Sequence, residues 1–299
     1  MNTVALFADR WILSGLHVTL ASLLDHARDS APMRLVVFGE QLTSFQRQLV
    51  ERTAAGRLGR HRLEFRAYAT PLAGRVRSLR GNYTTYGRLF LPDLLPDSDA
   101  CVYLDCDLVV TRPLDPLFAL ASAAPALHAE GSGVRRDSLD RPTFDALGMP
   151  LDAVYFNCGV LALNLTRWRD ERLSERCVAF AVEHPHALLS ADQTVLNCVL
   201  ADVTGTFGQE LNTFLWPDSP SVPADARTGR IFHFVGAPKP WNWLGRYANA
   251  NAALWHDWAT QTAWWEHWPS RISSRLGVRQ ELRLARATLR SLRNIRSSR

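Results

Sequence analysis

The sequence predicts an α/β protein whose sheet is mostly parallel and is flanked by helices on both faces. Over residues 3–69, short apolar segments alternate with amphipathic segments of helix length, and this alternation is typical of βαβ units. The runs LVVF and CVYLDCDLVV are rich in apolar and β-branched residues, as expected of strands buried in such a sheet. With 299 residues, 47% of them hydrophobic, the chain is long enough to bury a large core.

Individual strands and helices can be assigned in chain order from these patterns. We expect strands at 3–8, 33–39 and 61–69, with helices at 13–27 and 43–56 between them. A helical block at 82–100 should end at Pro92 and Pro96, because proline disrupts a helix interior. Beyond it, we expect one strand at 101–110, a pair of strands at 154–165, helices at 174–185 and 192–201, and a strand at 229–236.

The chain shows no internal repeat and no low-complexity linker before residue 250. We therefore expect one domain over 1–250, followed by an aromatic and arginine-rich helical extension over 251–299.

Charge and cysteine content exclude several classes of protein. The net charge is +5, but residues 271–299 hold nine arginines against the single acidic residue Glu281, so the rest of the chain is slightly acidic. An acidic body argues against a nucleic-acid partner. The five cysteines form no CxxC pair, which predicts neither a disulfide framework nor a thiolate zinc site and favours a reducing, cytoplasmic compartment. The N-terminus lacks a basic leader and no apolar run is long enough to span a bilayer, so we expect a soluble or peripheral protein.

Two aspartates in the run YLDCDLVV are the clearest candidate for chemistry. Side chains two apart on a strand share a face, so Asp105 and Asp107 should point the same way. A divalent cation would relieve the repulsion between two such carboxylates. His233, inside the apolar strand IFHFVG, is a candidate third ligand that would favour Mn²⁺, with Mg²⁺ as the alternative. The competing interpretations are a solvated strand end for the aspartates and a hydrogen-bonded core histidine for His233.

The only lysine of the chain follows this histidine closely. Lys239 lies in the stretch GAPKPW, after Gly236, and a lysine is a mobile point charge suited to reaching a phosphate oxygen. The alternative is an exposed turn with no special role. An ion held by Asp105, Asp107 and His233, with Lys239 and backbone N–H groups near Gly236, would suit a nucleoside diphosphate leaving group.

Five ordered blocks make the chain similar to a known family: LFADRW, YTTYGRLFLPDLLP, VYLDCDLVV, YFNCGVLALNL with DQTVLN, and HFVGAPKPW. They resemble glycosyltransferase family 8, the retaining, metal-dependent group that includes bacterial lipopolysaccharide galactosyl- and glucosyltransferases and glycogenin. The resemblance implies a GT-A fold, a Rossmann-like and mostly parallel sheet, and a UDP-sugar donor. It also implies that the two aspartates and His233 bind Mn²⁺ and that Lys239 contacts phosphate.

The resemblance further implies roles for residues around the nucleotide and the sugar. Asp9 would lie near the uridine, and Trp11 could stack on the base, because the first strand continues as Asp-Arg-Trp-Ile rather than with the family's usual polar run. The donor sugar would be lined by Arg88, Asn157, Asp192 and Gln193. Taken singly, Arg88 could be a surface helix residue, Asn157 a turn former, and Asp192 with Gln193 a helix start.

Retention of configuration by double displacement would need a carboxylate nucleophile. Asp192 is the nearest candidate and Gln193 the neutral alternative, since Thr194 stands where several relatives carry another acid. We expect instead same-face attack by the acceptor hydroxyl, with a leaving phosphate oxygen accepting the proton.

The resemblance implies transfer of a hexose, from UDP-glucose or UDP-galactose, to a glycan acceptor such as lipopolysaccharide or another cell-surface polysaccharide. Two alternatives remain open: a metal-dependent nucleotidyl- or phosphoryltransferase, which also uses paired aspartates, and a non-catalytic nucleotide-sugar-binding protein.

The C-terminal extension has the pattern of an interfacial membrane helix. An apolar stripe is flanked by a basic one, with Trp264, Trp265 and Trp268 upstream, residues that settle at membrane interfaces. The apolar stripe comprises Val278, Leu282, Ala285, Leu289 and Leu292, and the basic one Arg279, Arg283, Arg286, Arg290 and Arg293. Docking on the inner face of the cytoplasmic membrane would bring the protein to a lipid-linked acceptor. The alternatives are a solvated basic helix and a heptad seam for self-association into an oligomer.

Overall fold

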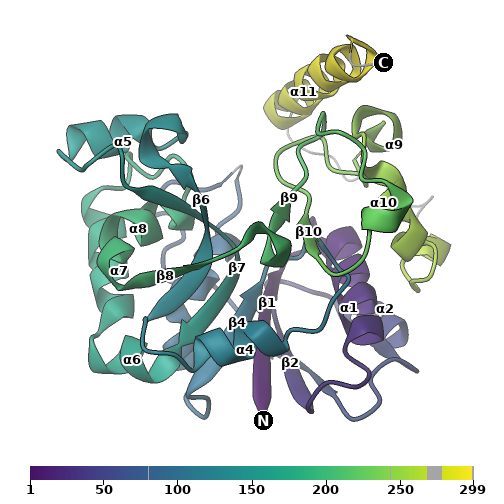
Figure 1. Cartoon of the computed structure of the whole chain (residues 1–299), viewed down its shortest axis with the longest axis horizontal. Coiled ribbons are helices and arrows are strands. Elements are labelled where there is room, and N and C mark those ends of the chain that lie inside the picture. The colour runs from purple at the N-terminus through teal and green to yellow at the C-terminus, as the bar shows by residue number, and fades with distance from the viewer. Residues whose placement is uncertain (80, 243, 268–277, 298–299) are drawn as a thin grey trace.

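The computed structural model describes residues 1–79, 81–242, 244–267 and 278–297. Its centre is a seven-stranded sheet of order β3-β2-β1-β4-β7-β6-β8 (Figure 1). Four of its six strand pairs are parallel, and β7 runs antiparallel to both of its neighbours. The strands are β1 (Asn2–Ala8), β2 (Met33–Gly39), β3 (Arg62–Ala67), β4 (Ala100–Leu104), β6 (Leu127–Val134), β7 (Val154–Asn164) and β8 (Thr204–Phe207).

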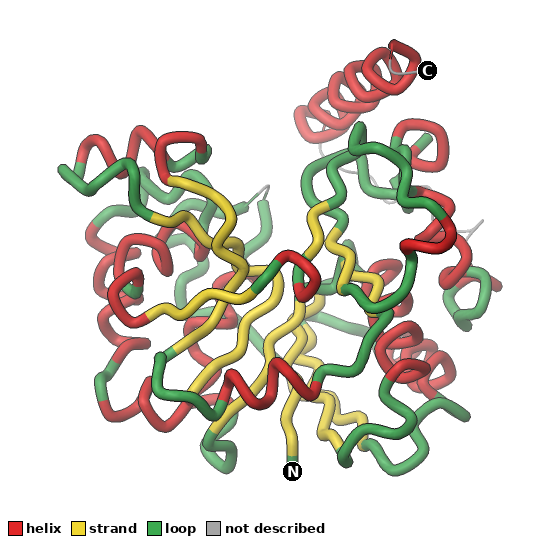
Figure 2. Tube along the Cα trace, in the orientation of Figure 1, coloured by secondary structure: helices red, strands yellow, loops and turns green. Residues whose placement is uncertain are grey.

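Helices cover both faces of this sheet (Figure 2). The α-helices are α1 (Leu13–His26), α2 (Ser44–Ala54), α3 (Leu91–Leu94), α4 (Asp115–Ala121), α5 (Arg141–Ala146), α6 (Leu165–Asp170), α7 (Leu173–Glu183), α8 (Asp192–Val199), α9 (Gly245–Ala248), α10 (Ala252–Ala259) and α11 (Val278–Ser297). Short 3₁₀ helices are η1 (Thr84–Phe90), η2 (Arg135–Asp137), η3 (Ala201–Val203), η4 (Gln209–Leu211) and η5 (Ala224–Ala226).

Alternation along the strands divides the core into two layers. On β1, Val4 and Leu6 pack with α1, α2 and α4, whereas Ala5 and Phe7 face η1, α6, α7 and α8. This is the period of two expected for a strand buried on both faces. All strands of the sheet except β7 run in the same direction. Their carboxyl ends therefore lie together along one edge of the sheet, perpendicular to the strands, where such folds bind ligands.

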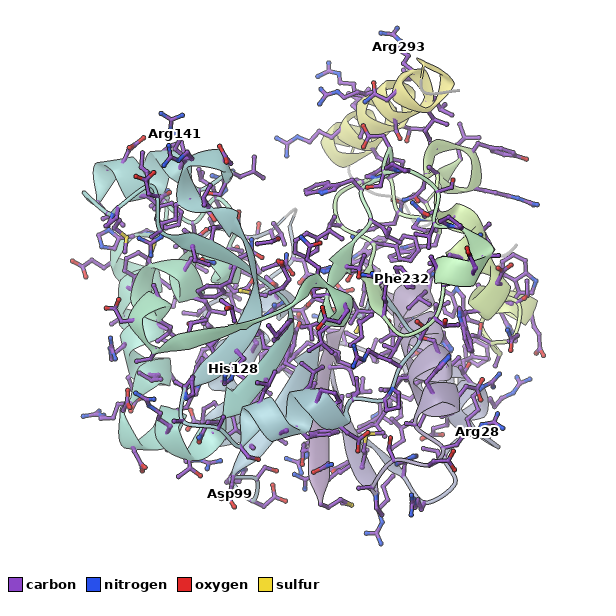
Figure 3. All side chains as sticks on the ribbon, in the orientation of Figure 1. Arg28, Asp99, His128, Arg141, Phe232 and Arg293 are labelled. Carbon is purple, nitrogen blue, oxygen red and sulfur yellow. The ribbon has the colours of Figure 1, made fainter. Side chains whose placement is uncertain are left out.

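A second, three-stranded sheet of order β5-β10-β9 lies beside this edge (Figure 1). It contains β5 (Leu108–Val110), β9 (Thr213–Phe214) and β10 (Ile231–His233). Phe232 of β10 is fully buried and packs with residues of α1 and α10, including Val18 and Trp255 (Figure 3). The small sheet is thus anchored to the main body on its apolar side.

The predicted α/β architecture with a mostly parallel sheet is confirmed, but three local assignments were wrong. Residues 101–110 form two strands, because the chain leaves the main sheet after Leu104 and enters the small sheet at Leu108. Residues 154–164 form one long strand instead of a pair. Pro92 lies in the first turn of α3 and does not end a helix, a position where the missing N–H costs nothing.

Helix α11 packs against α9 at the end of the molecule opposite the N-terminus (Figure 1). Thr288 and Ser291 are buried against the body, and Ser291 Oγ donates a hydrogen bond to the carbonyl of Ala248 at 2.7 Å. Leu282 and Leu289, in contrast, are 53% and 59% exposed. The side chains of Val278 and Arg279, and the whole of Trp268, lie outside the described residues. Among the helices that are described, none is both long and apolar enough to cross a bilayer.

Candidate active site

Asp105, Asp107 and His233 come together where the two sheets meet. The aspartates lie in the short connection between β4 and β5, and His233 ends β10. Antiparallel pairing of β10 with β5 places His233 opposite Leu108, next to Asp107 in the chain. One potential ligand atom from each of the three side chains lies within 4.8 Å of the others. His233 Nε2 is 3.2 Å from Asp107 Oδ1 and 3.8 Å from Asp105 Oδ2.

The predicted reason for this proximity was wrong, although the residues do meet. Asp105 and Asp107 do not share the face of one continuous strand, because the strand is interrupted between them. The interruption turns the chain from one sheet into the other and leaves both carboxylates at the junction.

Gly159 of β7 provides the room for the histidine ring. A Cβ at this position would lie 2.2 Å from His233 Cε1, far inside van der Waals contact. Gly159 also accepts a hydrogen bond from the backbone N–H of Asp105 at 2.7 Å. The glycine in the block YFNCGV therefore lets the imidazole and the first aspartate approach the same strand.

The donor set fits a divalent cation. Burial raises the pKa of Asp107, but Lys239 and His233 outweigh this effect and hold the pKa well below its usual range. Asp107 Oδ1 is buried and faces His233 Nε2 at 3.2 Å without a hydrogen-bond donor in good geometry. A buried, ionised oxygen without a hydrogen-bond donor is costly, and a cation between Oδ1 and His233 Nε2 would relieve that cost. Two carboxylates and an imidazole are donors that suit a divalent metal ion.

Lys239 reaches this cluster directly. Its Nζ lies 2.6 Å from Asp107 Oδ2 and also donates to the carbonyl of Phe234. The Asn242 side chain accepts a hydrogen bond from the Lys239 backbone N–H at 2.7 Å and fixes the loop. Gly236, which precedes the lysine, has φ 71° and packs against Trp216. The alternative of a merely exposed lysine is wrong, because the ammonium group is held at the carboxylates.

Arg88 links the first aspartate to Asp192. It is 4% exposed, and its guanidinium lies 2.8 Å from Asp105 Oδ1 and 2.8 Å from Asp192 Oδ2. It also donates to the carbonyl of Cys158 and stacks over the Tyr103 ring, with 4.2 Å to the centroid. Burial lowers its pKa, but the two carboxylates outweigh burial and raise it. The surface-helix interpretation of Arg88 is therefore wrong.

Asp192 begins α8 and is almost completely buried. Thr85 Oγ1 donates a hydrogen bond to its Oδ1, and Arg88 faces its Oδ2. Burial raises the pKa of Asp192 to about 6 despite the opposing effect of Arg88. A proton is thus bound more tightly by the folded state than by the unfolded chain.

This raised pKa predicts a pH-dependent gain in stability for Asp192→Asn. The folded protein loses stability from Asp192 as the pH rises from the unfolded value of 3.8 through about 6, whereas asparagine never ionises. Compared with the parent protein, the variant should therefore gain roughly 2 kcal/mol more at pH 7.5 than at pH 4.5. Urea unfolding of both proteins at the two pH values measures this difference. A stability difference that is the same at both pH values would show that the pKa is not raised.

Asn157 of β7 and Gln193 of α8 lie on the Nδ1 side of His233, and the two aspartates lie on its Nε2 side. Gln193 Oε1 accepts hydrogen bonds from Asn157 Nδ2 at 3.1 Å and from the backbone N–H of Cys158 at 3.0 Å. Gln193 Nε2 donates to the hydroxyl of Tyr155 at 2.6 Å. The carboxamide oxygen of Gln193 therefore already has two donors.

Asp9 and Trp11 lie at the end of β1. Asp9 Oδ1 accepts the backbone N–H groups of Trp11 and Ile12 at 2.8 and 3.1 Å, and Oδ2 accepts the Asn82 amide at 2.5 Å. Burial raises the pKa of Asp9. Trp11 is 37% exposed and lies under the Arg10 guanidinium, with 4.4 Å to the ring centroid.

Asn212 is the main site residue that the sequence did not reveal. It is fully buried and lies between His233 and Asn157. It precedes β9, a strand of only two residues, so no periodic pattern points to it. Only the pairing of β9 with β10, which sets Phe214 opposite His233, brings Asn212 to the site.

The mixed sheet flanked by helices, with this cluster where its parallel strands end, is the architecture of a GT-A glycosyltransferase fold. The solved galactosyltransferase LgtC, in complex with donor and acceptor sugar analogues, has this fold with a TM-score of 0.70 and 22% identity. The alignment covers 87% of this chain and 96% of LgtC. The model of the family "Glycosyl transferase family 8" matches residues 3–245. The chain belongs to glycosyltransferase family 8.

Two similar curated proteins come from bacteria. General stress protein A of Bacillus subtilis is 27% identical over 172 residues, covering 52% of this chain and 58% of the relative. The lipopolysaccharide 1,3-galactosyltransferase of Salmonella typhimurium is 26% identical over 262 residues, covering 82% and 74%. The alignment therefore spans less than two thirds of the first of these relatives and about three quarters of the second.

Proposed function

We propose that the protein transfers a hexose from a UDP-sugar, UDP-glucose or UDP-galactose, to a glycan acceptor with retention of configuration. The observation that carries this proposal is the cluster of Asp105, Asp107 and His233 beside Lys239, at the edge of the sheet where nucleotides bind. Membership of glycosyltransferase family 8 supports a sugar donor. The Salmonella relative favours lipopolysaccharide or another cell-surface polysaccharide as acceptor.

The residues of the cluster would hold Mn²⁺, or Mg²⁺ in its place. The bound ion would neutralise charge on the diphosphate as it leaves the sugar. The Lys239 ammonium group, 2.6 Å from Asp107 Oδ2, would pass to a phosphate oxygen when the donor binds, with backbone N–H groups near Gly236 completing the phosphate site. Asp9 and Trp11 are assigned to the uridine end, where the exposed indole offers a stacking face.

Arg88, Asn157, Asp192 and Gln193 are assigned to the sugar side of the site. The contacts of Asp192 and Gln193 disfavour either as a nucleophile. Both oxygens of Asp192 face Arg88 or Thr85, and the oxygen of Gln193 has two donors. A group in this state would have to break these contacts before attacking an anomeric carbon. We therefore favour same-face attack by the acceptor hydroxyl, with its proton passing to a leaving phosphate oxygen.

A screen for UDP release tests the proposed function. The protein is incubated with UDP-glucose, UDP-galactose and other UDP-sugars, with Mn²⁺ or with chelator, and with or without lipid-linked glycans. We expect metal-dependent release of UDP that acceptor accelerates. Release of pyrophosphate or phosphate would instead indicate a nucleotidyl- or phosphoryltransferase, and tight UDP binding without release would indicate a binding protein.

We also propose that α11 docks on the inner face of the cytoplasmic membrane and leaves the active site free to meet a lipid-linked acceptor. The face of α11 with Thr288 and Ser291 packs on the body, so the exposed face carries Leu282 and Leu289 beside a row of arginines. Exposed leucines next to cations are the features that bind an anionic interface. The exposed arginines of this row with described side chains are Arg283, Arg286, Arg290 and Arg293.

The five free cysteines support a reducing compartment. Self-association through the same face is the alternative, and the boundary between the domain and the extension at residue 250 stays a prediction.

Changing two arginines of α11 should weaken membrane binding. Each basic residue near an anionic surface contributes about 1 kcal/mol, so Arg286→Gln combined with Arg290→Gln should lower partitioning about 30-fold. Co-sedimentation with vesicles of phosphatidylglycerol and phosphatidylethanolamine measures the effect. The control combines Arg47→Gln with Arg62→Gln, two exposed arginines on α2 and β3. Equal loss in both double variants would show that overall charge, and not α11, drives binding.

A further inference from the structure

A continuous chain of hydrogen bonds leads from His233 away from the carboxylates. His233 Nδ1 lies 3.0 Å from Asn212 Oδ1, and Asn212 Nδ2 donates to Asn157 Oδ1 at 2.9 Å. Asn157 Nδ2 then donates to Gln193 Oε1 at 3.1 Å. Three side-chain amides thus connect the imidazole to the first turn of α8.

Backbone groups fix the direction of this chain. The N–H of Gly159 donates to Asn157 Oδ1 at 2.8 Å, and the N–H of Cys158 donates to Gln193 Oε1 at 3.0 Å. A backbone N–H can only donate, so each amide must turn its oxygen toward it. Asn157 Oδ1 is therefore an acceptor, and Asn212 must present its NH₂ group to it.

The orientation of Asn212 then determines the histidine. With its NH₂ group on Asn157, Asn212 has only its oxygen to offer to His233. The facing Nδ1 must carry a proton. In the neutral imidazole the lone pair is then on Nε2, the nitrogen 3.2 Å from the buried Asp107 Oδ1.

We propose that Asn212 is a positioning residue that selects the Nδ1–H tautomer of His233 and aims its Nε2 lone pair at the metal. The proposal deepens the proposed function and rests on its metal site. Asn212 would not itself touch metal or substrate. Mutation of a residue that hydrogen-bonds to a metal ligand typically lowers metal affinity 10- to 100-fold.

Two substitutions at Asn212 separate positioning from a merely structural role. Asn212→Ala removes the acceptor for Nδ1–H, and Mn²⁺ should bind 10- to 100-fold more weakly. Asn212→Asp keeps an acceptor for Nδ1–H but buries a charge against Asn157 Oδ1, so it should destabilise the fold more than alanine does while Mn²⁺ affinity stays within about threefold of the parent. The two variants should therefore rank in opposite orders for stability and for metal affinity.

Electron paramagnetic resonance titration with Mn²⁺ alone measures affinity, and urea unfolding measures stability. Asn164→Ala serves as the control, because Asn164 caps α6 from the far end of β7 and should alter stability without altering Mn²⁺ binding. Nitrogen-15 NMR of the metal-free protein at pH 9 should show Nδ1–H on His233 in the parent and in Asn212→Asp. In Asn212→Ala this preference should be lost.

The outcomes distinguish this inference from the proposed function. If the parent protein binds no Mn²⁺, the metal site itself is wrong, and the role given to Asn212 falls with it. If the parent binds Mn²⁺ and Asn212→Ala binds it equally tightly with an unchanged tautomer, only the present inference is overturned. Parallel losses of stability and affinity in the alanine and aspartate variants would also overturn it, because they would indicate a structural role alone.

Discussion

Asp107→Asn should lower kcat/KM for sugar transfer by at least about 10³-fold, because the metal loses a charged ligand at the point where diphosphate charge develops. The substitution keeps the size of the side chain but removes the charge that Lys239 and His233 surround. Initial rates of UDP release over a range of Mn²⁺ concentrations measure the effect. Raising Mn²⁺ to saturation should recover only part of the activity.

Asp202→Asn is the matched control, because Asp202 is an exposed aspartate of η3 remote from the cluster. Its activity should equal that of the parent. A fully active Asp107→Asn variant would remove Asp107 from the metal site and with it the proposed arrangement.

The second large effect is expected at Asp192. Asp192→Asn should lower kcat by at least about 10²-fold and leave the Kd for UDP in the presence of Mn²⁺ within about threefold of the parent. The amide no longer balances the charge of Arg88, which also holds Asp105, so the guanidinium loses its fixed place on the sugar side. Neither Lys239 nor His233 contacts Asp192 directly in the described interactions.

Isothermal titration with UDP and Mn²⁺, together with single-turnover rates, separates the two parameters. Asp170→Asn, at the exposed end of α6, should change neither. Loss of UDP binding in Asp192→Asn would mean that Asp192 organises the nucleotide site rather than the sugar site. A trapped covalent sugar on Asp192 would contradict same-face attack.

Much of the fold could be predicted because local patterns and tertiary structure agree. Over residues 3–69, each apolar run forms a parallel strand and each amphipathic segment a helix, as at β1, α1 and β2. The capping box of Thr43 and Gln46 begins α2 within one residue of the expected start. Such segments are decided by periodicity and local hydrogen bonding, which a single sequence contains.

The cluster of Asp105, Asp107 and His233 could be predicted as a group, but its geometry could not. The sequence shows one apolar run around the aspartates, and only the pairing of β5 with β10 reveals that the chain changes sheet between them. Strand pairing between distant segments leaves no periodic signal. The burial of Arg88 and the place of Asn212 between two strands were hidden for the same reason.

The tail illustrates a different limit. Its apolar stripe suggested one functional face, but a helix also needs a face that packs on the body. In the structure that face is formed by small polar residues, Thr288 and Ser291, which leave Leu282 and Leu289 exposed. Hydrophobicity alone does not show which side of such a helix meets the protein.

Crystals grown with Mn²⁺ and UDP, measured at the manganese absorption edge, test the central claim most directly. Our account predicts one anomalous peak within ligand distance of Asp105, Asp107 and His233 Nε2, with diphosphate oxygens completing the coordination. UDP bound with its diphosphate on protein groups alone, or manganese bound elsewhere, would contradict it.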